Sequence, residues 1–453
     1  MFTLVLKSLQ KALHNNPLSL FPKPFSQFLL CNQNVNCSSS NNGVSTTTFH
    51  DLPEETTAEI FSRLSVKDLI KSSSVNKAWY SLINNPSFIS SQIRKAVNFC
   101  DDNAVLIIPP FISHQNYCSL ISADTSRVIE KFDIPFVTKS GSLKLIAQVD
   151  GMLLLTDLHI DYASRELYLW NPFVRRHRVL VSSCFKRLLD DREKSYYVVG
   201  MGYDKGTDDY KVIRIVYVQD GKGKQFGEVA PKVEVYSLRK NTWKKMGDSR
   251  VPRLVNEMGA YVDGRYYWVE MKQPGTEEFN SLKGNELKIM SYDFDTQLFG
   301  EFNVPNRVPR LFGVIAPFKL MSFEGSLALC TLDPDCYNLV PPKYPFPIWL
   351  RRQRKGVGSW VLLATAVLKQ YGHPLNITKT GTLIVESFQS QRPDETHIVS
   401  INFKSRISKY HGYGKHGGPD VSREVLAPST VDTSFPQSLI MYEGGKSLLK
   451  YAK

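Results

Sequence analysis

The sequence predicts a mainly β protein in which a small N-terminal α module is followed by a β-propeller of about six blades. Three observations lead to this fold class. The chain of 453 residues contains 21 Tyr, 25 Phe and 6 Trp, a content that favours strands. Helical apolar spacing lies within 49–95, and from 101 onward short apolar runs alternate with Gly, Asp, Asn and Pro. Apolar strand positions recur there in steps of roughly 50–65 residues, the period of a kelch-type blade.

Residues 1–48 have the composition of a disordered leader. They contain no Asp or Glu and end in an Asn/Ser/Thr-rich stretch. An acid-free, Ser-rich start is also typical of a transit peptide, but this segment lacks arginine altogether. We therefore expect a disordered leader over 1–48.

The segment 49–95 predicts three short helices. Pro53 at the start of the first helix is followed by Glu54 and Glu55, which suit the positive end of the helix dipole. Ser65 is expected to cap the second helix, with Asp68 as its capping partner. Apolar residues at helical spacing supply the inner faces: Ile60, Phe61 and Leu64, then Leu69 and Ile70, then Val75, Trp79, Leu82 and Ile83, before Asn84-Asn85-Pro86 ends the third helix. A module this small is expected to leave apolar side chains for a partner to cover.

The region 101–453 predicts propeller blades built from two kinds of segment. One is a tight hairpin whose turn needs the positive φ that Gly supplies, at Asp150-Gly151, Asp263-Gly264, Glu324-Gly325 and Gly381. The other is a strand, a polar turn and a strand, around Trp170, Tyr236, Tyr292, Trp349 and Ile401. Ala104–Ile108 and Ser438–Tyr442 are candidates to pair and close the ring. A β-sandwich is the rival fold, but it rarely needs this length or this two-part periodicity.

The helical module resembles the F-box of plant F-box proteins. The resemblance rests on Leu52-Pro53-Glu54-Glu55, Glu59-Ile60-Phe61-Ser62-Arg63-Leu64, Val66-Lys67-Asp68-Leu69 and Val75-Asn76-Lys77-Ala78-Trp79, and it continues through Leu82-Ile83 and Pro86-Ser87-Phe88. It implies that the module docks an Skp-type adaptor, which in turn binds a cullin. The positions that match the family for docking are Leu52, Pro53, Ile60, Leu64, Leu69, Val75 and Trp79. Leu52 and Pro53, which precede the first helix, are the stronger candidates for direct contact.

This module departs from the family pattern at three places. Thr56-Thr57 stand where apolar residues are usual, Ser65 replaces a common Pro, and Ser72-Ser73-Ser74 replace a basic-aromatic-Cys stretch. Each change exchanges apolar area for a hydroxyl, at a cost on the order of 1 kcal/mol per lost methylene-scale contact. We therefore expect the adaptor to bind more weakly than is typical of the family, with the fold retained.

The region after the helices resembles the F-box-associated interaction domain of plants. The residues that carry this resemblance are Trp170-Asn171-Pro172, Gly202-Tyr203-Asp204 with Asp208–Ile213, and Val233–Leu238. It implies a binding domain that presents a target protein to a ubiquitin ligase of the Skp-cullin-F-box type for degradation, in the cytoplasm, the nucleus or both. The alternative is a kelch-type scaffold or ligand-binding protein that acts outside the ligase.

Catalytic and metal signatures are absent from the sequence. It contains no Gly-x-Ser-x-Gly, His-Glu-x-x-His or phosphate-binding loop, and its nine His are scattered singly. Cys330 and Cys336 have no His at metal spacing. No apolar stretch approaches the ~20 residues that span a bilayer, and the net charge of +13 includes no basic block long enough to specify nucleic acid. We expect no enzyme activity, cofactor, metal, membrane or nucleic acid.

Target specificity is expected to lie in long loops, at 183–196, 217–231, 272–287 and 333–347. The densest basic run, Arg351-Arg352-Gln353-Arg354-Lys355, has two interpretations. One is a nuclear import signal or a contact for a phosphorylated target, because guanidinium groups bind phosphate in pairs of hydrogen bonds. The other, which we favour, is a solvated loop that joins two strands.

Overall fold

The computed structural model describes residues 53–99, 104–108, 117–125, 127–137, 143–157, 166–190, 195–219, 229–247, 255–270, 288–305, 318–333, 343–354, 357–389, 392–405, 408–411, 430–432 and 437–441. The expected leader at 1–48, the docking candidate Leu52, all of the loop 272–287 and most of 217–231 and 333–347 lie outside these residues. The described residues form two compact units. A helical unit contains 53–99, the turn 171–176 and the segment 437–441, and a propeller unit contains the rest.

The helical unit has four helices rather than the three expected from the sequence: α3 (Glu54–Phe61), α4 (Val66–Ser73), α5 (Lys77–Ile83) and α6 (Pro86–Phe99). Asn84-Asn85-Pro86 ends α5 but also begins α6. The Asn85 Oδ1 accepts hydrogen bonds from the backbone N–H of Ser87 at 2.9 Å and from its hydroxyl at 2.8 Å. Pro86 costs α6 no hydrogen bond, because the backbone N–H at the first helical position has no acceptor within the helix.

The starts of α3 and α4 follow local signals in the sequence. Pro53 precedes α3 as its N-cap, one position earlier than expected, and Glu54 and Glu55 occupy the first turn. The predicted Ser65 cap of α4 is confirmed, because its hydroxyl accepts from the Asp68 N–H at 3.2 Å and donates to Asp68 Oδ2 at 2.8 Å.

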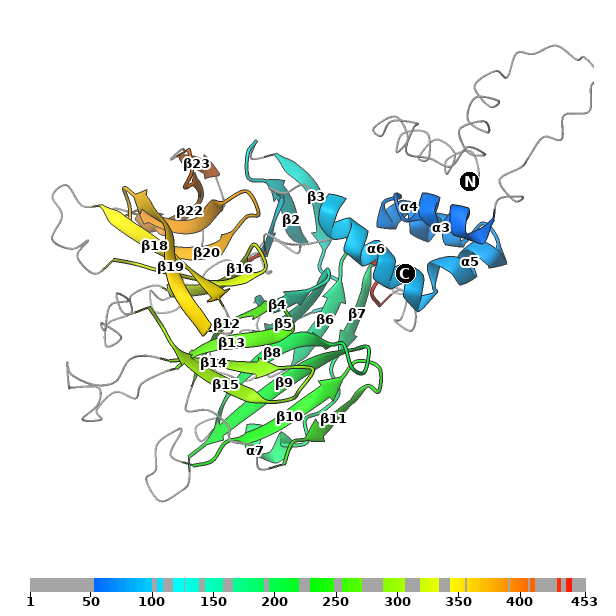
Figure 1. The fold of residues 1–453 in the computed structure, drawn as a ribbon, viewed down its shortest axis with the longest axis horizontal. Coiled ribbons are helices and arrows are strands. Elements are labelled where there is room, and N and C mark those ends of the chain that lie inside the picture. Colours follow the sequence, from blue (N-terminus) through cyan, green and yellow to red (C-terminus); the bar gives the residue numbers. More distant parts are fainter. Residues whose placement is uncertain are drawn as a thin grey trace, which may run out of the picture. The chain divides into compact units, whose positions relative to one another are not determined.

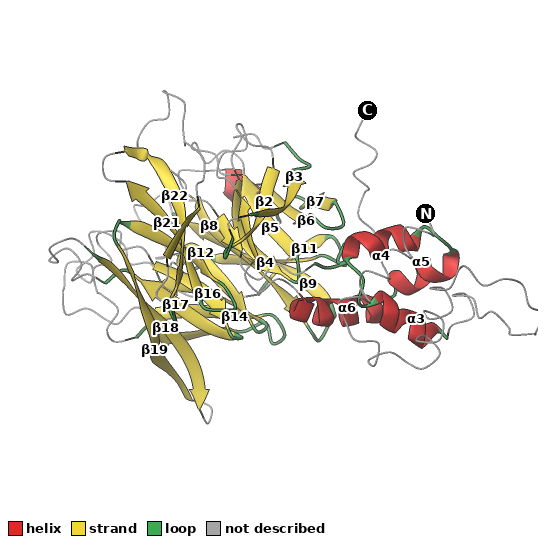
Figure 2. Cartoon of the chain, turned by 90° about the horizontal axis from the view of Figure 1, so that it is seen from above, coloured by secondary structure: helices red, strands yellow, loops and turns green. Residues whose placement is uncertain are grey.

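Six four-stranded sheets make up the propeller unit, which confirms the predicted fold class (Figure 1). Blade one contains β24 (Thr430–Asp432), β1 (Ala104–Ile108), β2 (Tyr117–Ser122) and β3 (Val128–Asp133); blade two contains β4 (Leu143–Val149), β5 (Met152–Asp157), β6 (Leu167–Asn171) and β7 (Arg176–Val179); blade three contains β8 (Ser195–Asp204), β9 (Asp209–Val218), β10 (Lys232–Ser237) and β11 (Thr242–Lys245). Blade four contains β12 (Val255–Val262), β13 (Arg265–Glu270), β14 (Lys288–Asp293) and β15 (Phe299–Asn303); blade five contains β16 (Phe318–Phe323), β17 (Ser326–Thr331), β18 (Tyr344–Arg354) and β19 (Val357–Leu368); blade six contains β20 (Gly372–Ile377), β21 (Thr382–Gln389), β22 (Arg392–Asn402) and β23 (Ser408–His411). Apart from the short α7 (Lys186–Asp190), the described helices belong to the helical unit (Figure 2).

The ring closes through a strand from each end of the propeller region. The innermost strands of successive blades contact one another around the ring: β4, β8, β12, β16, β20 and β24. As expected, Ala104–Ile108 pairs with a C-terminal strand, but that strand is β24, with Leu106 opposite Asp432 and Ile108 opposite Thr430. The prediction that 438–442 closes the ring is therefore wrong. Residues 437–441 form no strand and belong to the helical unit.

Both kinds of segment expected within a blade are present. The Gly-centred turns join the two inner strands of blades two, four, five and six, with Gly151, Gly264, Gly325 and Gly381 at φ between 67° and 84°. Asp150, Asp263 and Glu324, which precede three of these glycines, also have positive φ, as a type I′ turn requires. The strand–turn–strand segments form the two outer strands.

Neighbouring blades pack through apolar and aromatic side chains, and two glycines on β8 permit a close approach between blades three and four. A Cβ at Gly202 would lie 2.2 Å from the ring of Phe294 and 2.8 Å from that of Tyr261. A Cβ at Gly200 would lie 2.6 Å from the ring of Tyr266. The innermost strand of blade three therefore packs directly against the aromatic core of blade four.

Candidate partner-docking sites

The helical unit has an apolar core of its own, built by the inward faces of its helices. Phe61 of α3 meets Trp79 of α5 edge to face, with ring centroids 5.0 Å apart. The Asn76 Oδ1 accepts from the Trp79 N–H at 2.8 Å, which caps α5 and sets the turn that carries Trp79 inward. Leu69 and Ile83 are fully buried beside them.

Four of the seven docking residues predicted from the sequence lie in this core. Ile60, Leu64, Leu69 and Trp79 are each less than one-tenth exposed. Of the other three, Pro53 is exposed, Val75 is half-buried and Leu52 lies outside the described residues. A buried side chain reaches a partner only if its neighbours shift, so Pro53 and Val75 are the described members of the set that are open to direct contact. A docking role stays a prediction for all seven positions.

The outward face of α5 carries a residue that sequence reasoning missed. Tyr80 is 54% exposed, and it is the large apolar side chain that stands out to solvent among those described between 53 and 95. Lys77, Ala78 and Ser81 are exposed around it. The helical spacing of the sequence could have revealed Tyr80. Since Trp79, Leu82 and Ile83 fill the inward face of the helix, Tyr80 must lie on the outward face.

The hydroxyl groups of Thr57, Ser72, Ser73 and Ser74 have partners inside the helices. The Thr57 hydroxyl donates to the Pro53 carbonyl at 3.2 Å. The hydroxyls of Ser72, Ser73 and Ser74 donate to backbone carbonyls one turn back at 2.7–2.8 Å. Thr57, Ser72 and Ser73 are buried. These hydroxyl groups therefore affect the packing of the unit more than its surface, and weaker adaptor binding stays a prediction.

An ionic cluster links α3 to α6. Glu59 accepts from Arg63 at 3.0 Å, one turn along α3, and from Lys95 of α6 at 2.5 Å. The Lys95 ammonium also donates to the Ser62 hydroxyl at 2.8 Å. Burial raises the pKa of Glu59, but the hydrogen bonds from Lys95 and Arg63 outweigh it, so that this pKa lies below its usual value.

The segment 437–441 completes the helical unit from far along the chain. The Gln437 side-chain oxygen accepts from the Val66 N–H at 3.3 Å, and its backbone carbonyl accepts from Gln92 Nε2 at 3.1 Å. The Val66 N–H is one of the first amides of α4, which have no partner within the helix. Asn171 is fully buried, and its Nδ2 donates to the Ser438 carbonyl at 3.1 Å and to the Ile440 carbonyl at 3.0 Å.

In the propeller, the most specific motif recognised in the sequence forms a structural network. Asp204 pairs with Lys211, while Asp209 accepts from the backbone N–H of Arg239 at 2.9 Å. The Tyr210 hydroxyl donates to Asp150 Oδ2 at 2.9 Å, which joins blade three to the inner turn of blade two. Burial raises the pKa of Asp150, and the bond from Tyr210 offsets part of that rise. This motif therefore holds blades in place.

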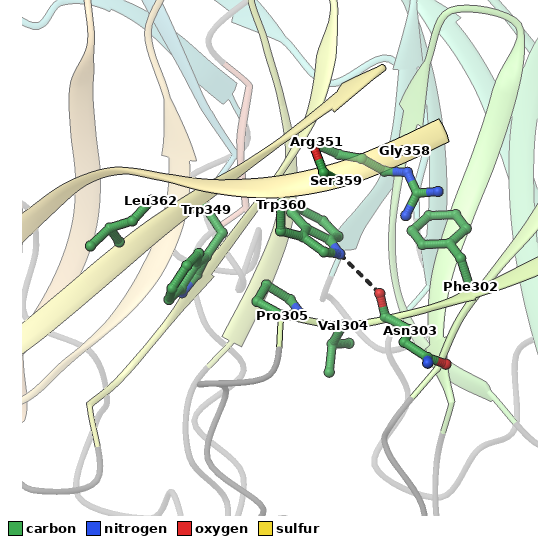
Figure 3. A pocket seen from close by; sticks show the side chains of 10 residues that line it. All are labelled: Phe302, Asn303, Val304, Pro305, Trp349, Arg351, Gly358, Ser359, Trp360 and Leu362. Atoms are coloured by element: carbon green, nitrogen blue, oxygen red, sulfur yellow. Dashed lines mark hydrogen bonds between the residues drawn. The ribbon is translucent and has the colours of Figure 1, made fainter. Parts of the chain in front are cut away.

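An open groove of about 600 Å³ lies between the outer parts of blades four and five. Phe302, Asn303, Val304 and Pro305 line it from blade four and the chain that follows β15, and the β18–β19 hairpin of blade five supplies the opposite side (Figure 3). The Trp360 Nε1 donates to the Asn303 carbonyl at 2.9 Å and fixes the two sides to each other. Trp349 and Leu362 lie beyond Trp360 along the same hairpin (Figure 3).

The groove combines aromatic surface with one cation. The Arg351 guanidinium lies over the ring of Phe302, 3.3 Å from its centroid. Gly358 leaves room for it, because a Cβ there would lie 2.4 Å from Arg351 Nη2. Burial lowers the pKa of Arg351, and the neighbouring Tyr267 partly offsets this. The Trp349 Nε1 is buried and has no hydrogen-bond partner.

Within the described ranges, the side chains provide no metal centre and no membrane span. No three His, Cys, Asp or Glu residues among them come together in a way that would hold a metal ion. None of the described helices is both long and apolar enough to cross a bilayer.

Comparison with known families agrees with these two units. The F-box domain family matches residues 49–91, and the family described as the F-box associated beta propeller domain matches residues 110–324. The chain is an F-box protein with an F-box-associated propeller. The matched ranges contain α3, α4 and α5 of the helical unit and strands β2 to β16, which run from blade one to the first strand of blade five.

Relatives of this F-box protein are found in Arabidopsis thaliana. It is 26% identical to the F-box protein CPR1 over 53% of this chain and 59% of that protein. It is 25% identical to the F-box protein At4g22390 over 69% of this chain and 73% of that protein. The F-box/kelch-repeat protein At3g23880 is 26% identical over 75% of this chain and 86% of its own length. The match thus spans less than two thirds of CPR1.

Among solved structures, the F-box protein is similar to TolB from Acinetobacter baumannii. The TM-score is 0.40 at 9% sequence identity, and the match covers 76% of this chain and 69% of that one. A similarity at this level supports no argument about function.

Proposed function

We propose that this F-box protein is the substrate-recruiting subunit of a ubiquitin ligase of the Skp-cullin-F-box type. The helical unit binds an Skp-type adaptor, the adaptor binds a cullin, and the propeller holds a target protein for ubiquitin-dependent degradation. The chain itself is not catalytic. The observation that carries this proposal is the union in one chain of an F-box and an F-box-associated propeller.

The surface of the helical unit supports docking at the start of α3 and on α5. Pro53 is exposed, and Glu54 and Glu55 beside it are exposed as well. Tyr80 offers a large amphipathic side chain, a residue type that is enriched at the centre of protein interfaces. The adaptor would cover these side chains without disturbing the buried core around Trp79.

The proposal is tested by co-purifying the full-length chain with an Skp-type adaptor and a cullin. We expect Leu52→Ala/Pro53→Ala to abolish co-purification and Tyr80→Ser to weaken it by about tenfold or more, because truncation of an anchoring side chain removes most of its contact area. Thermal unfolding of each variant shows whether its fold is intact. Undiminished adaptor binding by folded variants would overturn the docking assignment.

A matched control is Arg352→Gln, which changes an exposed side chain of blade five and should leave adaptor binding unchanged. Equal loss in this control would mean that the assay reports general damage. A chain that never binds the adaptor, with or without these changes, would favour the alternative of a scaffold or ligand-binding protein outside the ligase.

The proposal assigns the protein to the cytoplasm, the nucleus or both. Cys118, Cys184 and Cys330 are free thiols, which fits a reducing compartment. Fractionation of cells that express the tagged full-length chain tests this part, and recovery only in a secretory, mitochondrial or plastid fraction would contradict it.

A further inference from the structure

The outer hairpin of blade five differs from its counterparts. Its outermost strand, β19, has 12 residues, whereas the described outermost strands of the other blades, β3, β7, β11, β15 and β23, have four to six. An outermost strand has one unpaired edge, and proteins usually keep such strands short or charged. Leu362 and Val367 on β19 are 45% and 52% exposed. This strand is long, apolar and open.

The pairing register places the groove-lining side chains of the β18–β19 hairpin on one face. Trp349 lies opposite Leu362, and Arg351 lies opposite Trp360. Residues two apart on a strand share a face, so these four side chains point the same way. Trp349 and Trp360 pack against the apolar core between blades four and five, which identifies this face as the one that lines the groove.

Arg351 is a half-buried cation without a carboxylate partner among the described residues. Its contacts are the rings of Phe302 and Trp360. The next residue, Arg352, is exposed and pairs with Glu324 at 3.0 Å. A guanidinium that is partly removed from water gains most from a carboxylate that binds it through two hydrogen bonds. Among the described residues, the groove therefore offers no carboxylate to Arg351 and leaves Leu362 without apolar cover.

We propose that the propeller seats an extended segment of its target in this groove, and that the segment carries a carboxylate side chain two residues from a large apolar side chain. Alternate side chains of an extended chain lie roughly 7 Å apart on one face. That spacing matches the i, i+2 spacing of Trp349 and Arg351 on β18. The carboxylate binds Arg351, and the apolar side chain covers Trp349 and Leu362. This inference rests on the proposed function and names the class of target.

Charge favours an acidic peptide segment over other occupants. The hairpin carries the run Arg351-Arg352-Gln353-Arg354, and the whole chain has a net charge of +13. A second copy of the same basic chain would bring like charge to the groove. The predicted loop interpretation of the basic run was wrong for 351–354, which belong to β18.

The test pans a library of random peptides of about ten residues against the full-length chain, then measures the affinity of a selected peptide by fluorescence anisotropy. We expect selected sequences to share Asp or Glu two positions from Leu, Ile, Phe or Trp. Arg351→Gln should weaken binding by about tenfold or more, because it removes a charge-assisted pair. A version of the peptide in which the acidic residue is replaced by its amide should bind the wild type about as weakly as the acidic peptide binds Arg351→Gln. Arg351→Gln should not weaken the binding of this amide peptide any further.

Two further variants complete the experiment. Leu362→Ser should weaken the binding of the acidic peptide and of its amide version by the same factor, because it removes only the apolar contact. Arg352→Gln, adjacent to Arg351 but paired with Glu324 and on the opposite face, should change neither affinity. Thermal unfolding confirms that each variant is folded, and Arg351→Lys should retain part of the affinity because it keeps the charge.

The proposal is overturned if selected peptides show no acidic preference, or if Arg351→Gln and Arg352→Gln act equally. It is also overturned if sedimentation shows a wild-type dimer that Leu362→Ser dissociates, because the groove would then hold a second copy. Failure here with intact adaptor binding rejects the groove and leaves the proposed function standing. Loss of adaptor binding with intact peptide binding rejects the proposed function alone.

Discussion

Arg214 and Glu234 form a fully buried ion pair within blade three. The Arg214 Nη1 donates to Glu234 Oε1 at 2.9 Å, and the guanidinium stacks on Trp243 at 4.4 Å. Glu234 also accepts from the Ser183 hydroxyl and the Cys184 N–H. Burial lowers the pKa of Arg214, while Glu234 acts in the opposite direction. Each charge is therefore tolerated in the core only because the other is present.

Glu234→Gln should destabilise the propeller by about 3–5 kcal/mol, because it leaves the Arg214 charge buried without its counterion. Chemical denaturation of the full chain measures this change. The double variant Arg214→Met/Glu234→Leu should be more stable than Glu234→Gln, since no unpaired charge remains.

The comparison pair is Arg239 and Asp208, which are both more than half exposed. Arg239→Gln should change stability by at most about 1 kcal/mol. A similar cost for both single variants would show that burial does not set the strength of these pairs.

At the residue scale, the arrangement of the groove could not be predicted from the sequence as the fold could. A register shift in the β18–β19 pairing between Ile348 and Trp349 leaves Leu363 without an opposite residue. This bulge brings Leu362 and Val367 to one face, although simple alternation would put them on opposite faces. The contact between Trp360 and Asn303 joins different blades, which no local pattern can show.

At the scale of elements, the sequence predicted those that have a local chemical cause. The inner hairpins follow from Asp-Gly and Glu-Gly pairs, and α4 follows from the Ser65 cap. β24 has only three residues and no apolar alternation of its own. The sequence did not predict α6, because Asn and Pro are typical both of the end of one helix and of the start of the next. Its ties to α3 through Lys95 depend on packing.

Asn171→Ala should loosen the segment 437–441 and, through Gln437, the start of α4. It removes a buried side chain that donates to Ser438 and Ile440, and the expected cost to the helical unit is about 2–3 kcal/mol. Hydrogen exchange of the full chain measures it as faster exchange of the Val66 and Leu439 amides.

Gln437→Ala is the companion variant. It removes the side-chain acceptor of the Val66 N–H but keeps the Asn171 bonds, so it should cost about 1 kcal/mol and affect α4 alone. Unchanged exchange at Val66 in both variants would contradict the role given to this segment.

At the scale of the whole molecule, the closure of the ring contributes to the stability of the propeller. Blade one is complete only when β24 pairs with β1, so that the first and last blades cannot separate. Radial repetition of the blades usually leaves only short, protected sheet edges.

A chain that ends at residue 429 should therefore lose about 5 °C or more in Tm and unfold less cooperatively. The control is a chain that ends at 441, which keeps β24 and 437–441 and should melt as the full chain does. Equal melting of the two shortened chains would show that β24 is dispensable.

The position of β24 and the segment 437–441 also has a consequence for biosynthesis. Synthesis runs from the N-terminus, so the helices and β1 emerge well before the residues that complete blade one and those that cap α4. A nascent or prematurely terminated chain would therefore have neither a closed propeller nor a finished helical unit. Under the proposed function, adaptor binding and target binding would mature together once residues 430–441 have been made, and chains that lack them would compete poorly for the adaptor.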